Sequence, residues 1–445
     1  MDLSSIFKAY DVRGRTDAAL TPDAARAIGA AFAEFVDSSR VAVGRDCRAS
    51  SPGLSEAFID GVLSRGTDVV DLGEVATDTV YYISGARQMP GAMITASHNP
   101  PAYNGIKLCR AGAAPIGAES GLVEIRRLAE SGIEPVEDQG SVSTFDPVPG
   151  YVEHLLSIVD LDSFRPLQVG VDGGNGMAGV VVETVFDRIP PNLTGLYLEP
   201  DGSFPNHPAD PIDPANLVDL IDLVRREGLD LGVAFDGDAD RAFFVDDTGA
   251  PLSGSATTAL VARWFLARNP GATIVHNLIT SRAVPETILA HGGKPVRTRV
   301  GHSYIKQVMA ETGAVFGGEH SGHYYFADNF RADSGMLAML VLIQVMSEDG
   351  RRLSEIRADV EPYAASGEIN LTVEDQAGAV EEVAKRFADA DIDRLDGLTV
   401  SWEDRWFNLR PSNTEPLLRL NVEAPDESAV RRLVSEVRQT IQGAS

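Results

Sequence analysis

The sequence predicts an α/β protein made of three related mixed α/β domains plus a smaller C-terminal α+β domain around a central cleft. A chain of 445 residues is too long for one hydrophobic core. Up to about residue 365, helical patterns alternate with short runs rich in valine and isoleucine, which is typical of layered α/β structure. After that point the strands read as antiparallel. The expected domains are 1–147, 148–252, 253–365 and 366–445.

The first domain begins with a helix over 21–36, where Thr21 is a capping residue and Pro22 suits the first helical position. Apolar residues then recur at helical spacing. Strands are expected at 40–46, 67–73 and 91–97, because each is a short run of β-branched and apolar residues that ends in a turn signal.

The same scheme restarts twice. The second domain has expected strands at 167–174 and 229–238 and a helix at 216–228, and the third has a helix at 255–269 and strands at 272–278 and 313–320. Strands that end in acid at "VGRD", "VGVDGG" and "VAFDGD" suggest that the three domains are copies of one unit, although three short matches are weak support for a repeat.

The C-terminal domain has a different texture. Strands are expected in "EINLTVED", "LTVSWEDRWFNLRPSN" and "PLLRLNVEA", with helices over 379–389 and 427–442. This order of short strands and two helices indicates a small α+β domain.

Charge and cysteine content limit the class of protein. The chain has 38 basic and 65 acidic residues and a net charge of -27, which disfavours binding to nucleic acid or to an anionic membrane. Cys47 and Cys109 are too few for a disulfide framework, and neither a signal layout nor a long apolar run is present. We expect a cytoplasmic protein, a monomer or homodimer, that acts on small molecules.

The segment "DGDADR" places Asp236, Asp238 and Asp240 at alternate positions directly after an apolar strand. Carboxylates at this spacing converge on one hard cation, and Mg²⁺ is the expected ion. An EF-hand is excluded because its twelfth position would be Asp247 rather than Glu. The alternative is an acidic turn without a metal, which carries the cost of three mutually repelling charges.

The segment "ITASHNPPAYNGIKL" follows another strand with a cluster of turn formers. This pattern predicts that Ser97 and His98 lie exposed at the end of a strand. Lys107 is close enough in sequence for the chain to bring it back to the same strand end. A hydroxyl, an imidazole and an ammonium group at one strand end are suited to nucleophilic chemistry.

Two further loops carry polar residues of a different kind. In "RPSNTEP", Arg410, Ser412, Asn413 and Thr414, with Arg419 nearby, form a good cradle for a phosphate, and a surface capping turn is the alternative. In "GEHSGH", carboxylate, hydroxyl and imidazole groups suit the vicinal hydroxyls of a sugar, and a structural His320 is the alternative.

One motif points to another enzyme class. The segment "GNGMAG" at 174–179 fits G-x-G-x-x-G after a strand and has Glu199 twenty residues beyond, as in nicotinamide dehydrogenases. Against that reading, "RIPPN" at 188–192 breaks the helix that such a site needs. We expect these glycines to allow close packing instead.

Together these groups indicate phosphoryl transfer on a phosphorylated sugar. A phosphoryl group on Ser97 would supply oxygens to complete the coordination of Mg²⁺, and the cation would offset its charge. Ser97 is therefore the expected phosphoryl donor.

At this point the chain resembles a known family. The segments "YDVRG", "TASHNPPAYNGIKL", "DGDADR", "GEHSGH" and "RPSNTEP" resemble, in order and over nearly the whole chain, the signature set of the α-D-phosphohexomutases, phosphomannomutase/phosphoglucomutase branch. The resemblance implies four domains and interconversion of hexose 1-phosphate and hexose 6-phosphate, with mannose phosphate favoured and glucose phosphate as a second substrate. It also implies a phosphoserine, Mg²⁺ and a bound hexose 1,6-bisphosphate that acts as intermediate and activator.

The resemblance also assigns roles. Ser97, His98, Lys107 and Arg13 are the expected catalytic residues, and Ser97, Asp236, Asp238 and Asp240 the metal ligands. The expected substrate-binding residues are Tyr10, Arg241, His302, Glu319, Ser321, His323, Arg410, Ser412, Asn413, Thr414 and Arg419. Arg45, in "GRDCRASS", is expected to form a structural ion pair.

The chain departs from the family pattern at two places. The segment "HNLITSR" at 276–282 lacks a lysine that relatives often carry there, and Arg299 is a candidate replacement. His320 stands where the mannose and glucose enzymes commonly have methionine, and where phosphoglucosamine mutases usually have glutamine. A phosphoglucosamine mutase and a non-catalytic sugar-phosphate-binding protein are the alternatives.

Overall fold

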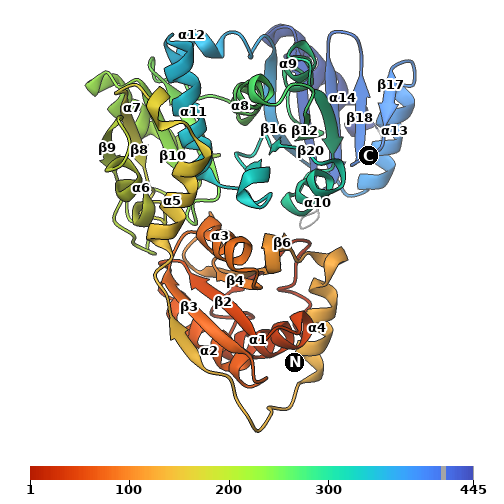
Figure 1. The fold of residues 1–445 in the computed structure, drawn as a ribbon. Helices are drawn as coiled ribbons and strands as arrows, with labels where there is room; N and C mark the ends of the chain where they lie inside the picture. Colours follow the sequence, from red (N-terminus) through yellow and green to blue (C-terminus); the bar gives the residue numbers. More distant parts are fainter. Residues whose placement is uncertain (412–416, 444–445) are drawn as a thin grey trace.

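The computed structural model of the chain describes residues 1–411 and 417–443. Four β-sheets with their helices follow one another along the chain. Figure 1 shows the first of these units, in red and orange, below the other three, which are arranged in a row from yellow-green to blue. The prediction of three mixed α/β units followed by a smaller α+β unit is confirmed.

Each unit can be given by its elements. The first contains β1 (Val12–Arg15), α1 (Pro22–Val36), β2 (Arg40–Arg45), α2 (Ser51–Leu63), β3 (Asp68–Glu74), α3 (Thr77–Arg87), β4 (Gly91–Ile94), β5 (Tyr103–Arg110), β6 (Ala114–Pro115), α4 (Leu122–Ser131) and β7 (Val142–Thr144). The second contains α5 (Val148–Ile158), β8 (Gln168–Asp172), α6 (Gly179–Phe186), β9 (Asn192–Leu196), α7 (Val218–Glu227), β10 (Leu231–Phe235) and β11 (Ala242–Asp246).

The third contains α8 (Gly254–Arg268), β12 (Thr273–Asn277), α9 (Ala283–Ala290), β13 (Lys294–Thr298), α10 (His302–Thr312), β14 (Phe316–Gly318), β15 (Tyr324–Phe326), α11 (Gly335–Asp349) and α12 (Leu353–Arg357). The fourth contains β16 (Ala364–Thr372), α13 (Gln376–Arg386), β17 (Asp391–Asp393), β18 (Leu398–Ser401), β19 (Trp406–Pro411), β20 (Leu417–Ala424) and α14 (Glu427–Gly443). The last sheet is antiparallel throughout.

The first three sheets share one strand order. It runs β5-β4-β2-β3 in the first unit, β11-β10-β8-β9 in the second and β15-β14-β12-β13 in the third. In each unit the three inner pairings have the same sense, with two parallel pairs and one antiparallel hairpin. The three units are therefore copies of one topology.

The sequence matches that suggested this repeat were partly wrong. Asp46 and Asp172 do lie at the ends of equivalent strands, β2 and β8. Asp236, however, follows β10, whose counterpart in the first unit is β4. The repeat is real, but the third acidic strand end belongs to a different strand of the unit.

The glycines of "GNGMAG" serve close packing, as expected. A Cβ on Gly176 would lie 2.6 Å from the carbonyl oxygen of Gly237, and one on Gly179 would lie 1.6 Å from that of Leu198. Neither position has room for a side chain, so the loop brings α6 against the chain segments beside it.

The second and third units share one hydrophobic core, whereas the first and fourth have cores of their own. Helix α11 links the shared core, since it follows the third sheet in sequence yet contacts both β11 and α8. Its side chains from Met336 to Leu342 are buried on all sides. In the described ranges, no helix has the length and apolar character needed to cross a bilayer.

Candidate active site

Three equivalent hairpin loops meet at one place. The loop between β4 and β5 carries Ser97, that between β10 and β11 carries the three aspartates, and that between β14 and β15 carries "GEHSGH". Ser97 Oγ lies 2.6 Å from Asp236 Oδ2, and Arg241 forms a β-bridge with His323. The repeated topology thus brings these three polar segments together from separate units.

Ser97 is buried, so the expectation of an exposed hydroxyl was wrong. Its residue is 1% exposed and has φ +54°, the left-handed conformation that non-glycine residues adopt rarely. Its hydroxyl donates to Asp236 and accepts from Arg241 Nη2 at 3.0 Å. The second unit covers this strand end, because its loop between β10 and β11 contributes both Asp236 and Arg241.

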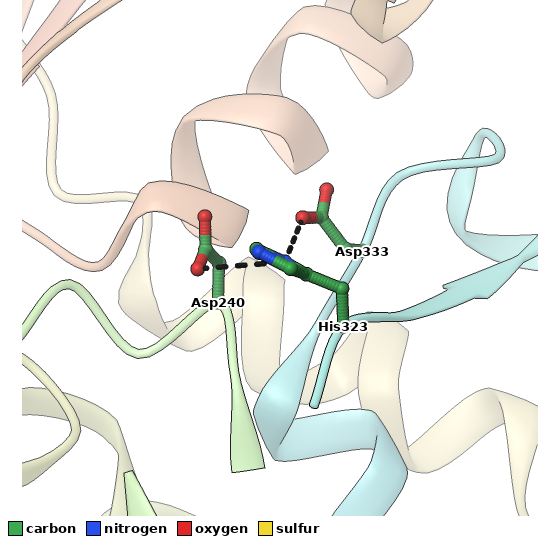
Figure 2. A group of neighbouring side chains, drawn as sticks. All are labelled: Asp240, His323 and Asp333. Carbon is green, nitrogen blue, oxygen red and sulfur yellow. Dashed lines mark hydrogen bonds and ion pairs between the residues drawn. The ribbon is translucent and has the colours of Figure 1, made fainter. Parts of the chain in front are cut away.

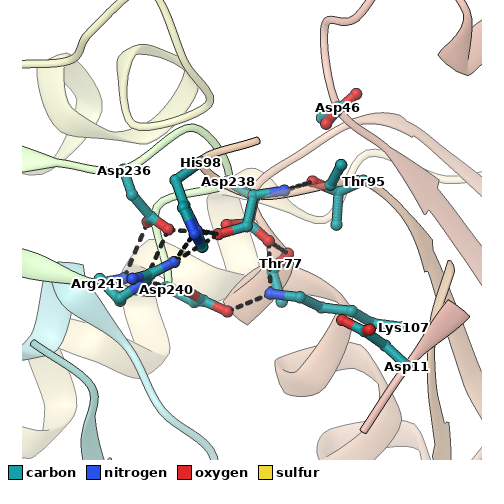
Figure 3. A network of polar contacts seen from close by, with 12 residues as sticks. Asp11, Asp46, Thr77, Thr95, His98, Lys107, Asp236, Asp238, Asp240 and Arg241 are labelled. Carbon is teal, nitrogen blue, oxygen red and sulfur yellow. Dashed lines mark hydrogen bonds and ion pairs between the residues drawn. The ribbon is translucent and has the colours of Figure 1, made fainter. Parts of the chain in front are cut away.

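The three aspartates are buried together with a lysine (Figure 3). Lys107 Nζ lies 2.7 Å from Asp238 Oδ2 and 2.5 Å from Asp240 Oδ2. Burial alone would lower the pKa of Lys107, but the two carboxylates outweigh it and raise that pKa. The pKa of Asp238 is lowered, since the ammonium outweighs burial, while burial raises the pKa of Asp236 to about 7.

The aspartate cluster fits a hard divalent cation. Oxygen atoms of Asp236, Asp238 and Asp240 all lie within 4.8 Å of one another. Asp238 Oδ1 and Asp240 Oδ1 are buried and have no hydrogen-bond partner in the part of the chain that the structure describes. Buried carboxylate oxygens without a donor are suited to a metal ion, and an all-oxygen set is the one that Mg²⁺ prefers.

His98 lies on the other side of the serine hydroxyl. Its Nδ1 is 3.1 Å from Ser97 Oγ and also contacts Arg241 Nη2. Arg241 and burial lower the pKa of His98, which keeps the imidazole neutral. Because the guanidinium donates to Nδ1, the ring proton is assigned to Nε2.

Arg13 reaches the serine loop from β1. Its Nη1 donates to Asn99 Oδ1 at 2.6 Å and to the carbonyl oxygen of Ala96 at 3.3 Å, and its Nε pairs with Asp11 at 2.9 Å. Tyr10 lies farther away, and its hydroxyl donates to the carbonyl of Val300 in the third unit.

The loop of the third unit contributes a second network (Figure 2). His323 Nδ1 lies 2.8 Å from Asp333 and 3.7 Å from Asp240, so it connects the aspartate cluster to the third unit. Burial opposes the charge, yet the two carboxylates raise the pKa of His323.

Glu319 accepts from Asn277 at 2.9 Å and from Tyr325 at 2.5 Å. His302 packs edge-on against Tyr10, and burial lowers its pKa.

A cavity of about 870 Å³ opens beside these loops and is lined by residues of all four units. Its walls include Tyr10, His320, Ser321, Arg410 and Arg419. Neither Ser97 nor the aspartates line it. The predicted substrate-binding side and the predicted reacting side are therefore neighbours without forming one open space.

Two arginines of the fourth unit, Arg410 and Arg419, line the cavity. Arg410 and Arg419 both approach Glu368, at 3.6 and 3.4 Å, and the Nε of each is buried without a hydrogen-bond partner among residues 1–411 and 417–443. Ser412, Asn413 and Thr414, the other members of the expected cradle, lie outside the described residues.

The two departures from the family pattern can be located. Arg299 is exposed and stacks on Tyr304 at 4.6 Å, and it does not line the cavity. His320 does line the cavity, and burial lowers its pKa to about 3, so its imidazole is neutral. The expected ion pair of Arg45 is confirmed, since its Nη2 lies 3.6 Å from Glu74.

Sequence reasoning missed several polar residues around the site. Thr77 donates to Asp238 at 2.6 Å, and Lys306 pairs with Asp333 at 2.7 Å. Arg48 holds the serine loop through its guanidinium, although its sequence segment drew attention only to Arg45. These residues come from other strand ends and helices, so only the folded chain brings them near the three loops.

Comparison with known proteins agrees with this architecture. Models of the phosphoglucomutase/phosphomannomutase family match along the chain, with α/β/α domain I at residues 4–134, domain II at 149–249, domain III at 253–363 and the C-terminal domain at 368–440.

Similar proteins span nearly the full length. A protein of Xanthomonas campestris named "Phosphohexose mutases" is 40% identical over 95% of this chain and 96% of its own length. A phosphomannomutase of Salmonella montevideo is 38% identical, with coverage of 95% and 96%. The crystal structure of a phosphoglucomutase/phosphomannomutase family protein from Burkholderia thailandensis has a TM-score of 0.92 and 32% identity, covering 100% of this chain and 98% of that one. The chain belongs to the phosphoglucomutase/phosphomannomutase family.

Proposed function

We propose that this protein is a phosphohexomutase that interconverts hexose 1-phosphate and hexose 6-phosphate, with mannose phosphate preferred and glucose phosphate as a second substrate. The observation that carries the proposal is the buried contact of 2.6 Å between Ser97 Oγ and Asp236 Oδ2, beside two buried cations, Lys107 and Arg241. A hydroxyl held in this way among carboxylates and cations is suited to carrying a phosphoryl group.

In this reaction Ser97 carries the phosphoryl group between turnovers. The free hydroxyl of a bound hexose monophosphate attacks the phosphorus, a new P–O bond forms, and the bond from phosphorus to Ser97 Oγ breaks. The proton of the attacking hydroxyl is transferred to Ser97 Oγ, so no proton is gained or lost overall. The product of this step is a bound hexose 1,6-bisphosphate. After it turns end for end, its other phosphoryl group returns to Ser97 by the reverse step. Added bisphosphate acts as an activator because it phosphorylates free Ser97.

Nearby groups have separate roles. Lys107, Arg241 and Arg13 stabilise negative charge on the transferring phosphoryl group. Since the pKa of Lys107 is raised, its ammonium keeps its proton and acts as a cation. His98 Nδ1, 3.1 Å from Ser97 Oγ, is the unprotonated nitrogen of a neutral ring, so it accepts the proton of the attacking hydroxyl and passes it to Ser97 Oγ when the phosphoryl group leaves.

Asp236, Asp238 and Asp240, together with an oxygen of phospho-Ser97, would hold Mg²⁺. When bound, the cation offsets the charge of the phosphoryl group. The donor set supports this assignment, because two of the carboxylate oxygens are buried without a partner.

The rest of the substrate occupies the cavity. Arg410 and Arg419, with Ser412, Asn413 and Thr414, hold the phosphate that does not react. Glu319, Ser321, His302, His323 and Tyr10 contact the sugar. Both ends of the hexose must be accepted in turn, which suits a site built from several units.

The enzyme opens and closes as it works. Ser97 is 1% exposed and does not line the cavity, so substrate reaches it only if the units move apart. The hinge lies near 365–370, at the start of the fourth unit. Small-angle scattering with and without hexose bisphosphate tests this movement, and identical dimensions would contradict it.

The direct test is conversion of mannose 1-phosphate to mannose 6-phosphate with Mg²⁺ and a catalytic amount of hexose 1,6-bisphosphate. Catalytic efficiencies on mannose, glucose and glucosamine 1-phosphates then establish the preferred sugar. No turnover of any hexose phosphate would overturn the proposal. A phosphoryl group of about 80 Da on Ser97, lost upon incubation with sugar monophosphate, separates an enzyme from a binding protein.

A further inference from the structure

The loop that carries Ser97 is held by one buried arginine. Arg48 is 1% exposed and lies three residues after the end of β2. Strand β2 is the neighbour of β4, the strand that leads to Ser97, in the first sheet. Its Nη2 donates to the carbonyl oxygens of Ser97 and Asn99, both at 2.7 Å. Its Nη1 donates to the carbonyls of Pro100 at 2.9 Å and Tyr103 at 3.1 Å.

The guanidinium uses every donor it has. The fifth N–H, on Nε, donates to Asp46 Oδ2 at 3.1 Å, and Asp46 is itself fixed by contacts with the Arg48 amide and the Ser51 hydroxyl. A guanidinium has five N–H donors in a rigid fork, whereas a lysine ammonium has only three. Only arginine can therefore hold four carbonyls and a carboxylate at once.

The second unit covers this arginine. A Cβ on Gly202 would lie 2.4 Å from Arg48 Cα, so the backbones of the two units are in close contact there. The ring of Phe204 lies 5.0 Å from Arg48 Cζ, within range of a cation–π interaction. The second unit, which also supplies the three aspartates, therefore packs on the arginine that holds the serine loop.

We propose that Arg48 is a positioning residue for phosphoryl transfer: it fixes the Ser97 loop, including the left-handed backbone at Ser97, so that Oγ faces Asp236. This inference rests on the proposed function. Arg48 contacts backbone carbonyls of the loop, whereas Asp236 and Arg241 contact the reacting hydroxyl, so Arg48 acts through the loop rather than on the substrate. A displacement of about 1 Å in a reacting group costs roughly 10²-fold in rate.

The experiment measures one half-reaction. Unphosphorylated protein is mixed with hexose 1,6-bisphosphate and Mg²⁺, and phosphorylation of Ser97 is followed by rapid quench and intact mass. A positioning role predicts that Arg48→Met lowers the single-turnover rate constant about 10²-fold while the full amplitude is reached. A loss of folded protein alone would instead lower the amplitude and leave the rate constant unchanged.

Arg45→Met is the matched control, because Arg45 lies three residues away and pairs with Glu74 at the surface. It should keep the wild-type rate constant. If Arg48→Met does not fold, Arg48→Lys and Phe204→Leu replace it, with expected losses of about tenfold and about two- to fivefold.

A wild-type rate constant in the folded Arg48 variants would overturn the inference and leave the proposed function standing. If the wild-type protein itself takes up no phosphoryl group from any hexose bisphosphate, the proposed function fails and this inference fails with it.

Discussion

Lys107 Nζ lies 2.7 Å from Asp238 Oδ2, and both groups are buried. The ammonium therefore neutralises part of the negative charge that a metal ion would otherwise neutralise at these carboxylates. In the proposed reaction a divalent cation and Lys107 would share the aspartate cluster, and the balance between them can be measured.

Replacing Lys107 by methionine should strengthen Mg²⁺ binding by about tenfold, since it removes a positive charge beside the cluster. Turnover should fall by at least about 10²-fold, because the transferring phosphoryl group loses a cation. Titration calorimetry measures the first effect and a coupled assay the second. Lys385→Met, on the exposed face of α13, should change neither. Equal Mg²⁺ affinities in wild type and Lys107→Met would contradict this view of the cluster.

Ser97→Ala should abolish turnover while leaving the chain folded. The hydroxyl contacts only polar groups, so its loss removes two hydrogen bonds without opening an apolar cavity. The expected change in stability is about 1–3 kcal/mol, because Asp236 and Arg241 each lose a partner. Turnover, phosphoryl incorporation by intact mass and thermal unfolding provide the three readouts. Residual activity above about one per cent of wild type would remove Ser97 from the role of phosphoryl donor.

Arg410→Met should raise KM for hexose phosphates by about 10- to 100-fold, the cost of losing a charge-assisted contact to a phosphate. The single-turnover transfer from bound bisphosphate should change much less, because Arg410 lines the cavity, whereas Ser97 does not. Arg431→Met, on exposed α14, is the control for a lost surface charge. A fall in kcat with unchanged KM would place Arg410 in the chemistry rather than in binding.

Asp78 joins three units. It lies in α3 of the first unit and accepts from Tyr151 of α5 and from Ser334, which precedes α11, at 2.8 Å in the latter case. Burial raises the pKa of this carboxyl to about 7. Because the folded state binds this proton more tightly than the unfolded state, the stability that Asp78 contributes is fully present below about pH 4 and is lost as the pH rises through about 7.

Asp78→Asn should remove this dependence, since the amide keeps an acceptor and cannot ionise. A shift of about three units corresponds to about 4 kcal/mol, or several degrees in Tm, between pH 4 and 7.5. Thermal unfolding of wild type and variant over this range measures it. Asp23→Asn, on exposed α1, should follow the wild-type curve. Parallel curves for Asp78→Asn would show that the carboxyl is ionised throughout.

The sequence was a good guide to groups that lie close together along the chain. The aspartates and the Ser97 to Lys107 segment each form a local pattern after a strand, so their positions at strand ends followed from turn chemistry. The helix over 21–36 was accurate to one residue, because Thr21 accepts from the Ala24 amide and Pro22 begins the helix.

Contacts between segments that are distant in sequence could not be predicted from local patterns. The burial of Ser97 arises from Asp236 and Arg241 in another unit, and the role of Arg48 depends on carbonyls some 50 residues away. Helix α11 drew no notice for a related reason: its apolar residues face in all directions, so it has no amphipathic period to detect. Residues 379–389 were expected to be helical, but the helix spans Gln376–Arg386 because Asp375 accepts from Gly378 at its start.

In the first three units, which share one strand order, equivalent hairpin loops carry different functional groups. The same hairpin position holds Ser97, the proposed phosphoryl carrier, in one copy, the three aspartates in the next and the proposed sugar contacts in the third. No copy is sufficient by itself, yet each hairpin is anchored in its own sheet. Substitutions in the third hairpin can therefore alter the proposed contacts to the sugar while the hairpins that carry Ser97 and the aspartates keep their own sheets unchanged.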